Sequence, residues 1–231
     1  MTRSPVVSGL VALLLLLLGY AFSIAVRAGL ADVYAEPAKS FLQKKRNAGE
    51  ALTGDEWRAV YDGLSRALVL APGDPENTSE LARLHRILLE DADLDAEQIT
   101  RIGDTAAGHY RAAIARRPTW PWDWIDLARV KYEQYQDAQA EYQDALVRAV
   151  EFGPREALLQ DQVAWLGMNT WSVLRAPASL AVLTAADRAL EADADALDWM
   201  LEDAERWRLP CTRAGESFSH FRQRCASLGL T

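Results

Sequence analysis

Apolar residues recur along most of this chain at the spacing of amphipathic helices. Tyr142, Leu146, Ala149 and Val150 follow one another at i, i+4, i+7 and i+8, which places them on one face of a helix. Valines and isoleucines elsewhere are scattered at similar spacing, and no alternating strand pattern of convincing length occurs. The pattern predicts an all-α fold.

Capping and breaking residues delimit the predicted helices. Residues 53–56 read Thr-Gly-Asp-Glu, the form of a capping box. Thr119 is a candidate N-cap with Pro121 in the first turn, and Gly153 precedes Pro154 as a stop at which glycine can adopt a left-handed cap. The expected helices cover about 53–71, 76–91, 95–117, a segment from 119 that includes Lys131, a segment from Asp137 to 153, and 155–174, 178–192 and 194–208, before a short one within 211–225.

Three of these helices end in the same way, with an alanine followed five residues later by a proline. The pairs are Ala67–Pro72, Ala113–Pro118 and Ala149–Pro154, and the last two prolines stand 36 residues apart. A period in the thirties is typical of stacked helical hairpins, in which each unit buries its apolar face against a neighbour. Stacked hairpins usually present an extended surface to which other molecules bind, so we expect a protein that binds partners rather than a catalyst.

The N-terminal segment is uniformly apolar. Residues 4–26 contain no charge and include an unbroken leucine run at 13–18. About 20 apolar residues are enough to cross a bilayer, and a signal peptide has a shorter apolar core. We expect residues 1–27 to be an uncleaved transmembrane anchor with 4–26 in inner-membrane lipid, although weak cleavage sites near Ala28 and Ala31 leave a signal peptide open.

The rest of the chain is expected to form three regions. Residues 28–52 are predicted to be a juxtamembrane stalk interrupted by Pro37 and Gly49. Residues 53–210 are predicted to be a short solenoid of helical hairpins, and 211–231 a C-terminal cap that contains Cys211 and Cys225.

Two signals disagree on the side of the membrane that the C-terminal domain occupies. Arg3 stands before the span, whereas Arg27 and four cations within 28–52 follow it, and the positive-inside bias then favours the cytoplasm. Cys211 and Cys225 are the only cysteines, and an isolated even pair is typical of a disulfide in an oxidising compartment. We expect a single-pass protein of the bacterial inner membrane with its C-terminal domain in the periplasm; two free buried thiols in a cytoplasmic domain are the alternative.

Charge argues against a nucleic-acid partner. All 33 acidic residues and 24 of the 25 basic residues follow position 26, which gives that part a net charge of −9. Nucleic-acid phosphates require basic surface. The cluster at 44–46 (Lys-Lys-Arg) is expected to be a solvated helix face.

The middle of the chain resembles tetratricopeptide repeats. In that family one helix carries an aromatic residue, leucine and a crossing alanine, and its partner ends in alanine and proline. The matching residues are Trp124, Leu127 and Ala128 in the first helix, Leu146, Ala149 and Pro154 in the second, and Ala164 in the next. The chain departs from the family in its period of 36 and in lacking a glycine in the first helix.

A narrower resemblance is to polysaccharide-biosynthesis proteins of the VpsP family. It rests on the run 117–124 (Arg-Pro-Thr-Trp-Pro-Trp-Asp-Trp), on Lys131, on 152–154 (Phe-Gly-Pro), on Trp171 and on the terminal cysteine pair. The resemblance implies an inner-membrane accessory of exopolysaccharide or O-antigen assembly, with other assembly proteins as partners. A tetratricopeptide-type factor of pilus assembly or cytochrome maturation is an alternative, as is a non-catalytic polysaccharide-binding protein.

Four residues are candidates for a ligand or partner surface: Trp120, Trp122, Asp123 and Lys131. Trp120 and Trp122 flank Pro121 in an interhelix turn, where flat aromatic faces could bind sugar rings. Wedging between neighbouring hairpins is the simpler role, because aromatic residues dominate such packing. Trp124 fits the packing register and is expected in the core.

No catalytic, cofactor or metal site is predicted. Asp91, Asp93 and Asp95 imitate the start of a calcium loop, but Ala96 stands where the loop requires glycine and Ile102 where it requires an acid. The three histidines, at 85, 109 and 220, are expected to lie far apart, and no nucleophile with a neighbouring base can be named.

Overall fold

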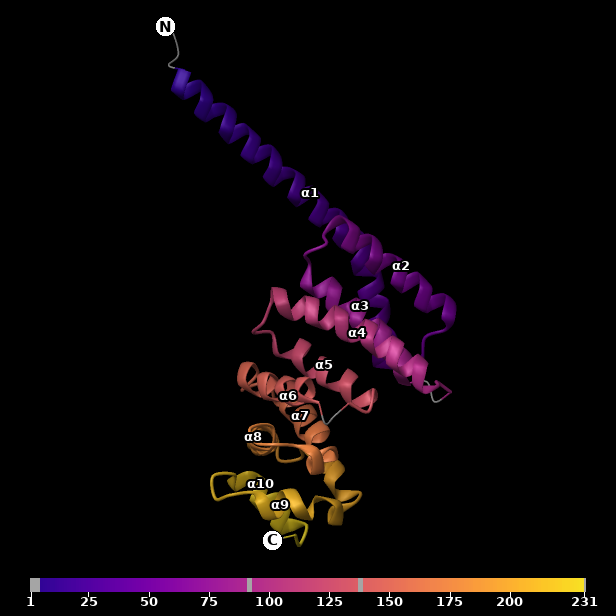
Figure 1. Cartoon of the computed structure of the whole chain (residues 1–231), viewed down its shortest axis with the longest axis vertical. Helices are drawn as coiled ribbons and strands as arrows, with labels where there is room; N and C mark the ends of the chain where they lie inside the picture. Colours follow the sequence, from indigo (N-terminus) through magenta and orange to yellow (C-terminus); the bar gives the residue numbers. More distant parts are fainter. Residues whose placement is uncertain (1–4, 91–92, 137–138, 231) are drawn as a thin grey trace. The chain divides into compact units, whose positions relative to one another are not determined.

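The protein is described by a computed structural model that covers residues 5–90, 93–136 and 139–230. Within these ranges the secondary structure is helical and contains no strand, so the prediction of an all-α fold is confirmed (Figure 1). The chain divides into two compact units, Met1–Leu84 and His85–Thr231. The first begins with the long apolar helix that the sequence predicts, and the second contains the helical hairpins.

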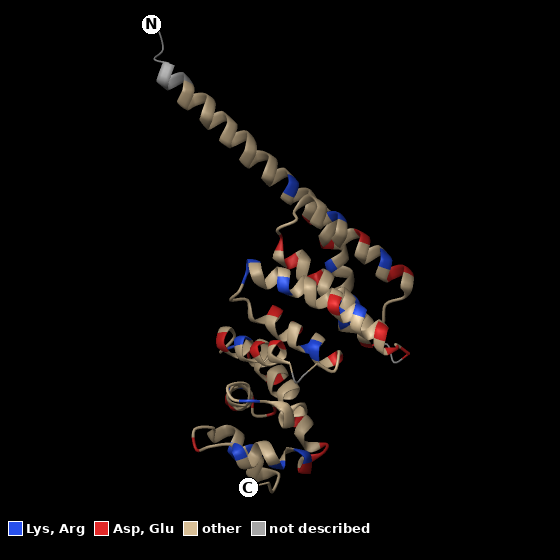
Figure 2. Cartoon of the chain, in the orientation of Figure 1, with Lys and Arg blue, Asp and Glu red and all other residues tan. Residues whose placement is uncertain are grey.

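Helix α1 (Pro5–Ala48) is long and apolar enough to cross a membrane. Its large hydrophobic side chains between Leu10 and Val26 are exposed to solvent rather than packed on other helices. Figure 2 shows no charged residue along this stretch, and the next charge in the sequence is Arg27.

The predicted interruption at Pro37 is wrong, because α1 continues through it and ends at Ala48, before Gly49 at φ 65°. Helix α2 (Gly54–Leu70) packs along this part of α1. Burial of Ala31, Ala35, Ala38 and Leu42 on one face of α1 stabilises the helix enough to offset a proline, which costs about 3 kcal/mol in a helix interior. Residues 28–48 are therefore a packed element of the first unit.

The predicted capping box at the start of α2 is confirmed. The Thr53 side chain accepts a hydrogen bond from the Glu56 amide, and the Glu56 carboxylate accepts one from the Thr53 amide. Helix α3 (Pro75–Ile87) follows, and its Leu84 carbonyl accepts a hydrogen bond from the Trp57 indole at 3.0 Å. A short 3-10 turn, η1 (Leu88–Glu90), follows α3 and belongs to the second unit.

The second unit contains a series of consecutive helices that pair as hairpins. These are α4 (Ala96–Arg116), α5 (Pro121–Glu133), α6 (Ala140–Phe152), α7 (Ala157–Asn169) and α8 (Ala178–Ala192). Helices α5 and α6 pair, as do α7 and α8, and contacts of α5 with α7 and of α6 with α8 stack the two hairpins. The repeat residues Leu127, Ala128, Leu146, Ala149 and Ala164 are all buried, as their predicted role requires.

At each alanine–proline pair the helix ends with the same type of backbone hydrogen bond. The carbonyls of Ala67, Ala113 and Ala149 accept hydrogen bonds of 2.8–3.0 Å from the amides of the cap residues 71, 117 and 153. Each cap residue directly precedes a proline, which disfavours the helical conformation of its predecessor. The repeat in the sequence is thus a repeated helix terminus with a buried alanine.

Two local predictions are corrected, and a third cannot be compared with the structure. Gly153 has φ −115°, not a left-handed value, and it is required for space, since a Cβ there would lie 3.0 Å from the Pro121 side chain. Trp120, not Thr119, occupies the N-cap of α5 and makes no side-chain capping bond. The expected start of α6 at Asp137 lies outside the described residues.

The segment 194–208, predicted as one helix, forms two short 3-10 turns, η3 (Asp198–Leu201) and η4 (Ala204–Trp207). They are anchored by polar contacts: the Asp161 carboxylate accepts a hydrogen bond from the Trp199 indole at 3.0 Å, and the Met200 carbonyl accepts one from the Trp207 indole. Another short 3-10 turn, η2 (Trp171–Val173), follows α7.

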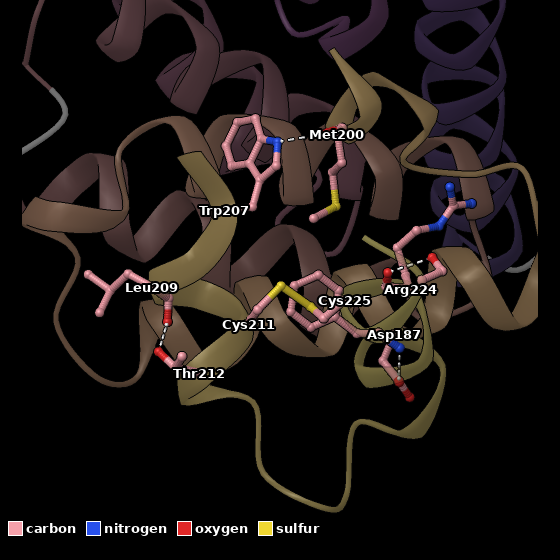
Figure 3. Close-up of a disulfide and its surroundings, with 10 residues drawn as sticks. Asp187, Met200, Trp207, Leu209, Cys211, Thr212, Arg224 and Cys225 are labelled. Atoms are coloured by element: carbon pink, nitrogen blue, oxygen red, sulfur yellow. Dashed lines mark hydrogen bonds between the residues drawn. A yellow bond between two sulfur atoms is a disulfide. The ribbon is translucent and has the colours of Figure 1, made fainter. Parts of the chain in front are cut away.

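A disulfide joins the last two helices. Cys211 of α9 (Arg208–Arg213) is bonded to Cys225 of α10 (Ser219–Ser227), with Cα atoms 5.7 Å apart (Figure 3). Both cysteines are buried in the apolar core of the second unit, which also includes Trp207 and Phe221. The predicted cysteine pair is confirmed.

Candidate partner-binding groove

An open groove of about 490 Å³ runs over helices α4, α5 and α6. Its lining is mainly apolar, with charged residues on α4 and α6. The lining residues are Arg111, Ile114 and Ala115 from α4, Trp124 and Leu127 from α5, and Ala140, Glu141 and Asp144 from α6. An apolar concave surface with a few charges is the usual form of a peptide-binding or helix-binding site.

Glu141 connects the charged residues beside the groove. Its carboxylate accepts two hydrogen bonds from the Arg111 guanidinium, at 2.6 and 2.7 Å. The Lys131 ammonium lies 3.5 Å from Oε2 of the same carboxylate, the oxygen that also accepts the 2.7 Å hydrogen bond from Arg111. The hydrogen bonds from Arg111 lower the pKa of Glu141, so the carboxylate is charged at neutral pH.

Lys131 is not on a surface, contrary to the prediction. It is 2 % exposed, and its ammonium donates hydrogen bonds to the side-chain oxygens of Gln134 and Gln136. A buried ammonium is tolerated only when its donors find acceptors. Lys131 therefore links the end of α5 to the start of α6, where Glu141 lines the groove.

Gln134 extends this polar cluster to α4. Its side-chain amide donates to the Thr100 carbonyl and to the Asp104 carboxylate, at 3.2 and 3.1 Å. It lies directly against Gly103, where any side chain would overlap it. This glycine permits the close approach of α4 and α5 beside the groove.

Asp123 is also buried rather than on a surface, at 1 % exposure. It accepts two hydrogen bonds from Arg117, at 2.7 and 2.9 Å. The Arg117 guanidinium in turn lies over the Trp120 ring, 5.2 Å from its centre. Asp123 therefore fixes the conformation of the turn that carries Trp120.

The three tryptophans of this turn have different environments. Trp120 is 46 % exposed. Trp122 is half-buried against the core, as expected for a residue wedged between helices. Trp124, predicted as core, is half-buried, donates from its indole to the Pro118 carbonyl at 2.7 Å, and lines the groove. Of the four predicted surface residues, Trp120 is the exposed one. The groove itself is lined by two residues that were predicted for the repeat instead, Trp124 and Leu127.

The structure also brings together side chains that sequence reasoning treated as unrelated. The rings of His85 and His109, expected far apart, have centres 5.5 Å apart. Burial and the neighbouring His85 lower the pKa of His109. No local sequence signal could reveal this pair, because its members lie on different helices.

A second buried charge pair joins the end of α3 to α5. Arg86 donates to Glu133 at 3.0 Å and to Glu90 of η1 at 3.1 Å. Burial raises the pKa of Glu133 from about 4.5 to about 7, against the opposing effect of Arg86. Neither Arg86 nor Glu133 lines the groove. The pair is a structural contact in which the pKa of the Glu133 carboxyl is raised.

The part of the chain that the structure describes contains no cluster of three or more histidine, cysteine, aspartate or glutamate residues suited to a metal ion. Asp91 lies outside the described residues. Asp95 caps α4 by accepting a hydrogen bond from the Gln98 amide at 2.8 Å.

The sequence matches no protein-family model and no curated protein at a significant level. The resemblances to tetratricopeptide repeats and to the VpsP family therefore stay predictions that rest on the residues quoted for them.

Proposed function

We propose that the protein is a membrane-anchored scaffold that binds a partner protein in the groove of α4, α5 and α6. The groove itself carries the proposal: it is open, mainly apolar, and built from helices that further contacts fix in place. A helix or an extended peptide is the ligand that suits such a surface.

The anchor supports a role at a membrane. An exposed apolar helix of this length has no stable environment in water, and its length suits a bilayer core of about 30 Å. Crossing the bacterial inner membrane once, it restricts the hairpin unit to the membrane neighbourhood. The disulfide agrees with a periplasmic location, since such bonds persist in oxidising compartments.

The process that we assign is exopolysaccharide or O-antigen biosynthesis or export, with polymerising or exporting membrane proteins as partners. This assignment depends on the resemblance to the VpsP family in the run 117–124 and at Lys131. The acidic balance of the chain agrees with a protein partner and not with a nucleic acid.

Ala115 and Ala112 allow a direct test. Both are exposed on α4, but Ala115 lines the groove and Ala112 does not. Ala115→Arg places a charged side chain in the groove, and we expect it to weaken co-purification of polysaccharide-assembly proteins about tenfold, equivalent to about 1.4 kcal/mol. The same variant should reduce surface polymer.

Ala112→Arg is the matched control and should leave both readouts unchanged. Equal behaviour of the two variants would contradict the groove as the binding site. Normal polymer together with loss of a pilus or cytochrome protein from the purified complex would show that the scaffold serves another envelope machine.

A further inference from the structure

Helix α2 returns along α1 toward the apolar segment, and two contacts fix its register (Figure 1). The Lys45 ammonium lies 2.9 Å from the Glu56 carboxylate, near the start of α2. Ten residues later in α2, the Arg66 guanidinium lies over the ring of Tyr34, eleven residues earlier in α1. Continuing three residues in each direction brings Val69 level with Ala31.

Gly63 makes this register specific. A Cβ at that position would lie 3.1 Å from the Tyr34 carbonyl and 3.3 Å from the Ala38 side chain. The two backbones therefore approach closely at Gly63. A shift of one helix along the other would bring a larger side chain into this contact, where there is no space for it.

The end of α2 consequently lies close to the membrane. Ala31 is five residues beyond Val26, the last residue of the uncharged stretch, which is about 7.5 Å at 1.5 Å per residue. The headgroup layer on each side of the hydrocarbon core is roughly 5–8 Å thick. When the uncharged stretch fills the core, the last turn of α2 and the following residues reach the headgroups.

The composition of this segment suits that position. Residues 67–73 carry no charge, and they read Ala-Leu-Val-Leu-Ala-Pro-Gly. Val69 is 78 % exposed, and Leu30 of α1, at nearly the same level, is 47 % exposed. Arg66 precedes the segment and Arg27 lies at the membrane end of α1, where cations favour lipid phosphates.

We propose that the end of α2, residues 68–73, enters the headgroup layer of the bilayer that α1 crosses. The occupant of this apolar surface is lipid, because the surface continues directly from the apolar part of α1. The first unit then rests on the membrane, and residues 28–48 do not act as a spacer. The inference depends on the proposed membrane span but not on the groove.

The test uses the full chain in vesicles of phosphatidylcholine and phosphatidylglycerol. A Val69→Cys variant is labelled with the polarity-sensitive fluorophore nitrobenzoxadiazole, which reacts with the new thiol because Cys211 and Cys225 are disulfide-bonded. An Arg58→Cys variant is the control, since residue 58 is exposed near the opposite end of the same helix.

We expect lipid with a doxyl group near the headgroup to quench the label at 69 about twofold more than the label at 58, and aqueous iodide to show the opposite order. Equal quenching at both positions would overturn the inference. Resistance of the chain to carbonate extraction is measured on the same vesicles: an extractable chain contradicts the span and this inference together, whereas an inserted chain with a water-exposed label at 69 contradicts this inference alone.

Discussion

Glu141 of α6 accepts two hydrogen bonds from Arg111 of α4, at 2.6 and 2.7 Å, across the side of the groove. The two residues are 30 positions apart in the sequence, and neither belongs to the repeated alanine–proline pattern. Their contact joins helices that are not consecutive and gives the groove a defined width.

The role of Glu141 can be measured through its contact with Lys131. Glu141→Ala removes an acceptor from a buried ammonium, and we expect it to lower the free energy of unfolding by about 1–2 kcal/mol, less than for a fully buried pair because Glu141 is partly exposed. Lys131→Met removes the charge while keeping most of the apolar volume. The double variant should be more stable than the sum of the two single effects predicts. Thermal unfolding of the full chain in detergent micelles measures this, and strict additivity would show that the two residues do not interact.

Glu133 should make stability depend on pH. Its pKa is raised in the folded state from about 4.5 to about 7, mainly by burial, with Arg86 and Arg129 opposing and Glu90 reinforcing the shift. A raised carboxyl pKa means that the folded state binds the proton more tightly than the unfolded state. The protonated Glu133 therefore adds to the free energy of unfolding, fully below pH 4.5, and this addition is lost as the pH rises to about 7.

Glu133→Gln removes this titration. The unfolding free energy of the unmodified chain, relative to the variant, should fall by up to about 3 kcal/mol between pH 4.5 and 8, since each pKa unit corresponds to about 1.4 kcal/mol. Unfolding measured at several pH values tests this, and a constant difference between the two proteins would mean that Glu133 titrates normally.

Gly167 is required for the contact between α7 and α8. A Cβ at this position would overlap the branched Val182 side chain, which cannot rotate away. We expect Gly167→Ala to destabilise the protein by about 1–3 kcal/mol, as overpacked cores generally are. Addition of Val182→Ala should recover part of this loss.

Gly108→Ala is the matched control for that substitution. Gly108 lies within α4 with nothing within 4 Å of a built Cβ, so alanine there should stabilise the helix by up to about 1 kcal/mol. The same sign for both substitutions would refute the steric explanation.

The disulfide should stabilise the C-terminal helices. Closing a loop of about 15 residues contributes about 3 kcal/mol in the chain-entropy model, and Cys211 and Cys225 are 14 positions apart. The Cys211→Ser/Cys225→Ser variant should therefore expose the amides of α10 to faster hydrogen exchange than those of α5. Unchanged exchange in α10 would show that core packing alone fixes this helix.

The parts of the fold that depend on local sequence were predictable. The helix ends at Leu70, Arg116 and Phe152 follow from the proline two residues later and from the buried alanine three residues earlier, and both signals lie within six positions. The cap at Thr53 and the first-turn Pro121 are local in the same sense. The prediction of one helix over 194–208 was wrong because the turns of this segment depend on polar contacts with distant residues such as Asp161.

The candidate site was less predictable because its polar residues have unusual environments. Lys131 and Asp123 were expected on a surface, since charged residues are almost never fully buried unless they are paired. Their partners, Glu141 and Arg117, become visible when the helices are placed together. The groove was not predicted either, although two of its lining residues, Trp124 and Leu127, had been identified from their repeat positions.

The central claim is that the groove of α4, α5 and α6 binds a protein at the membrane, and photocrosslinking in the producing cells tests it most directly. A photoreactive benzoylphenylalanine at position 115, within the groove, should yield a crosslinked product that contains a polysaccharide-assembly membrane protein. The same group at the exposed position 112 should not. Absence of the product at 115, or equal products at both positions, would contradict the account.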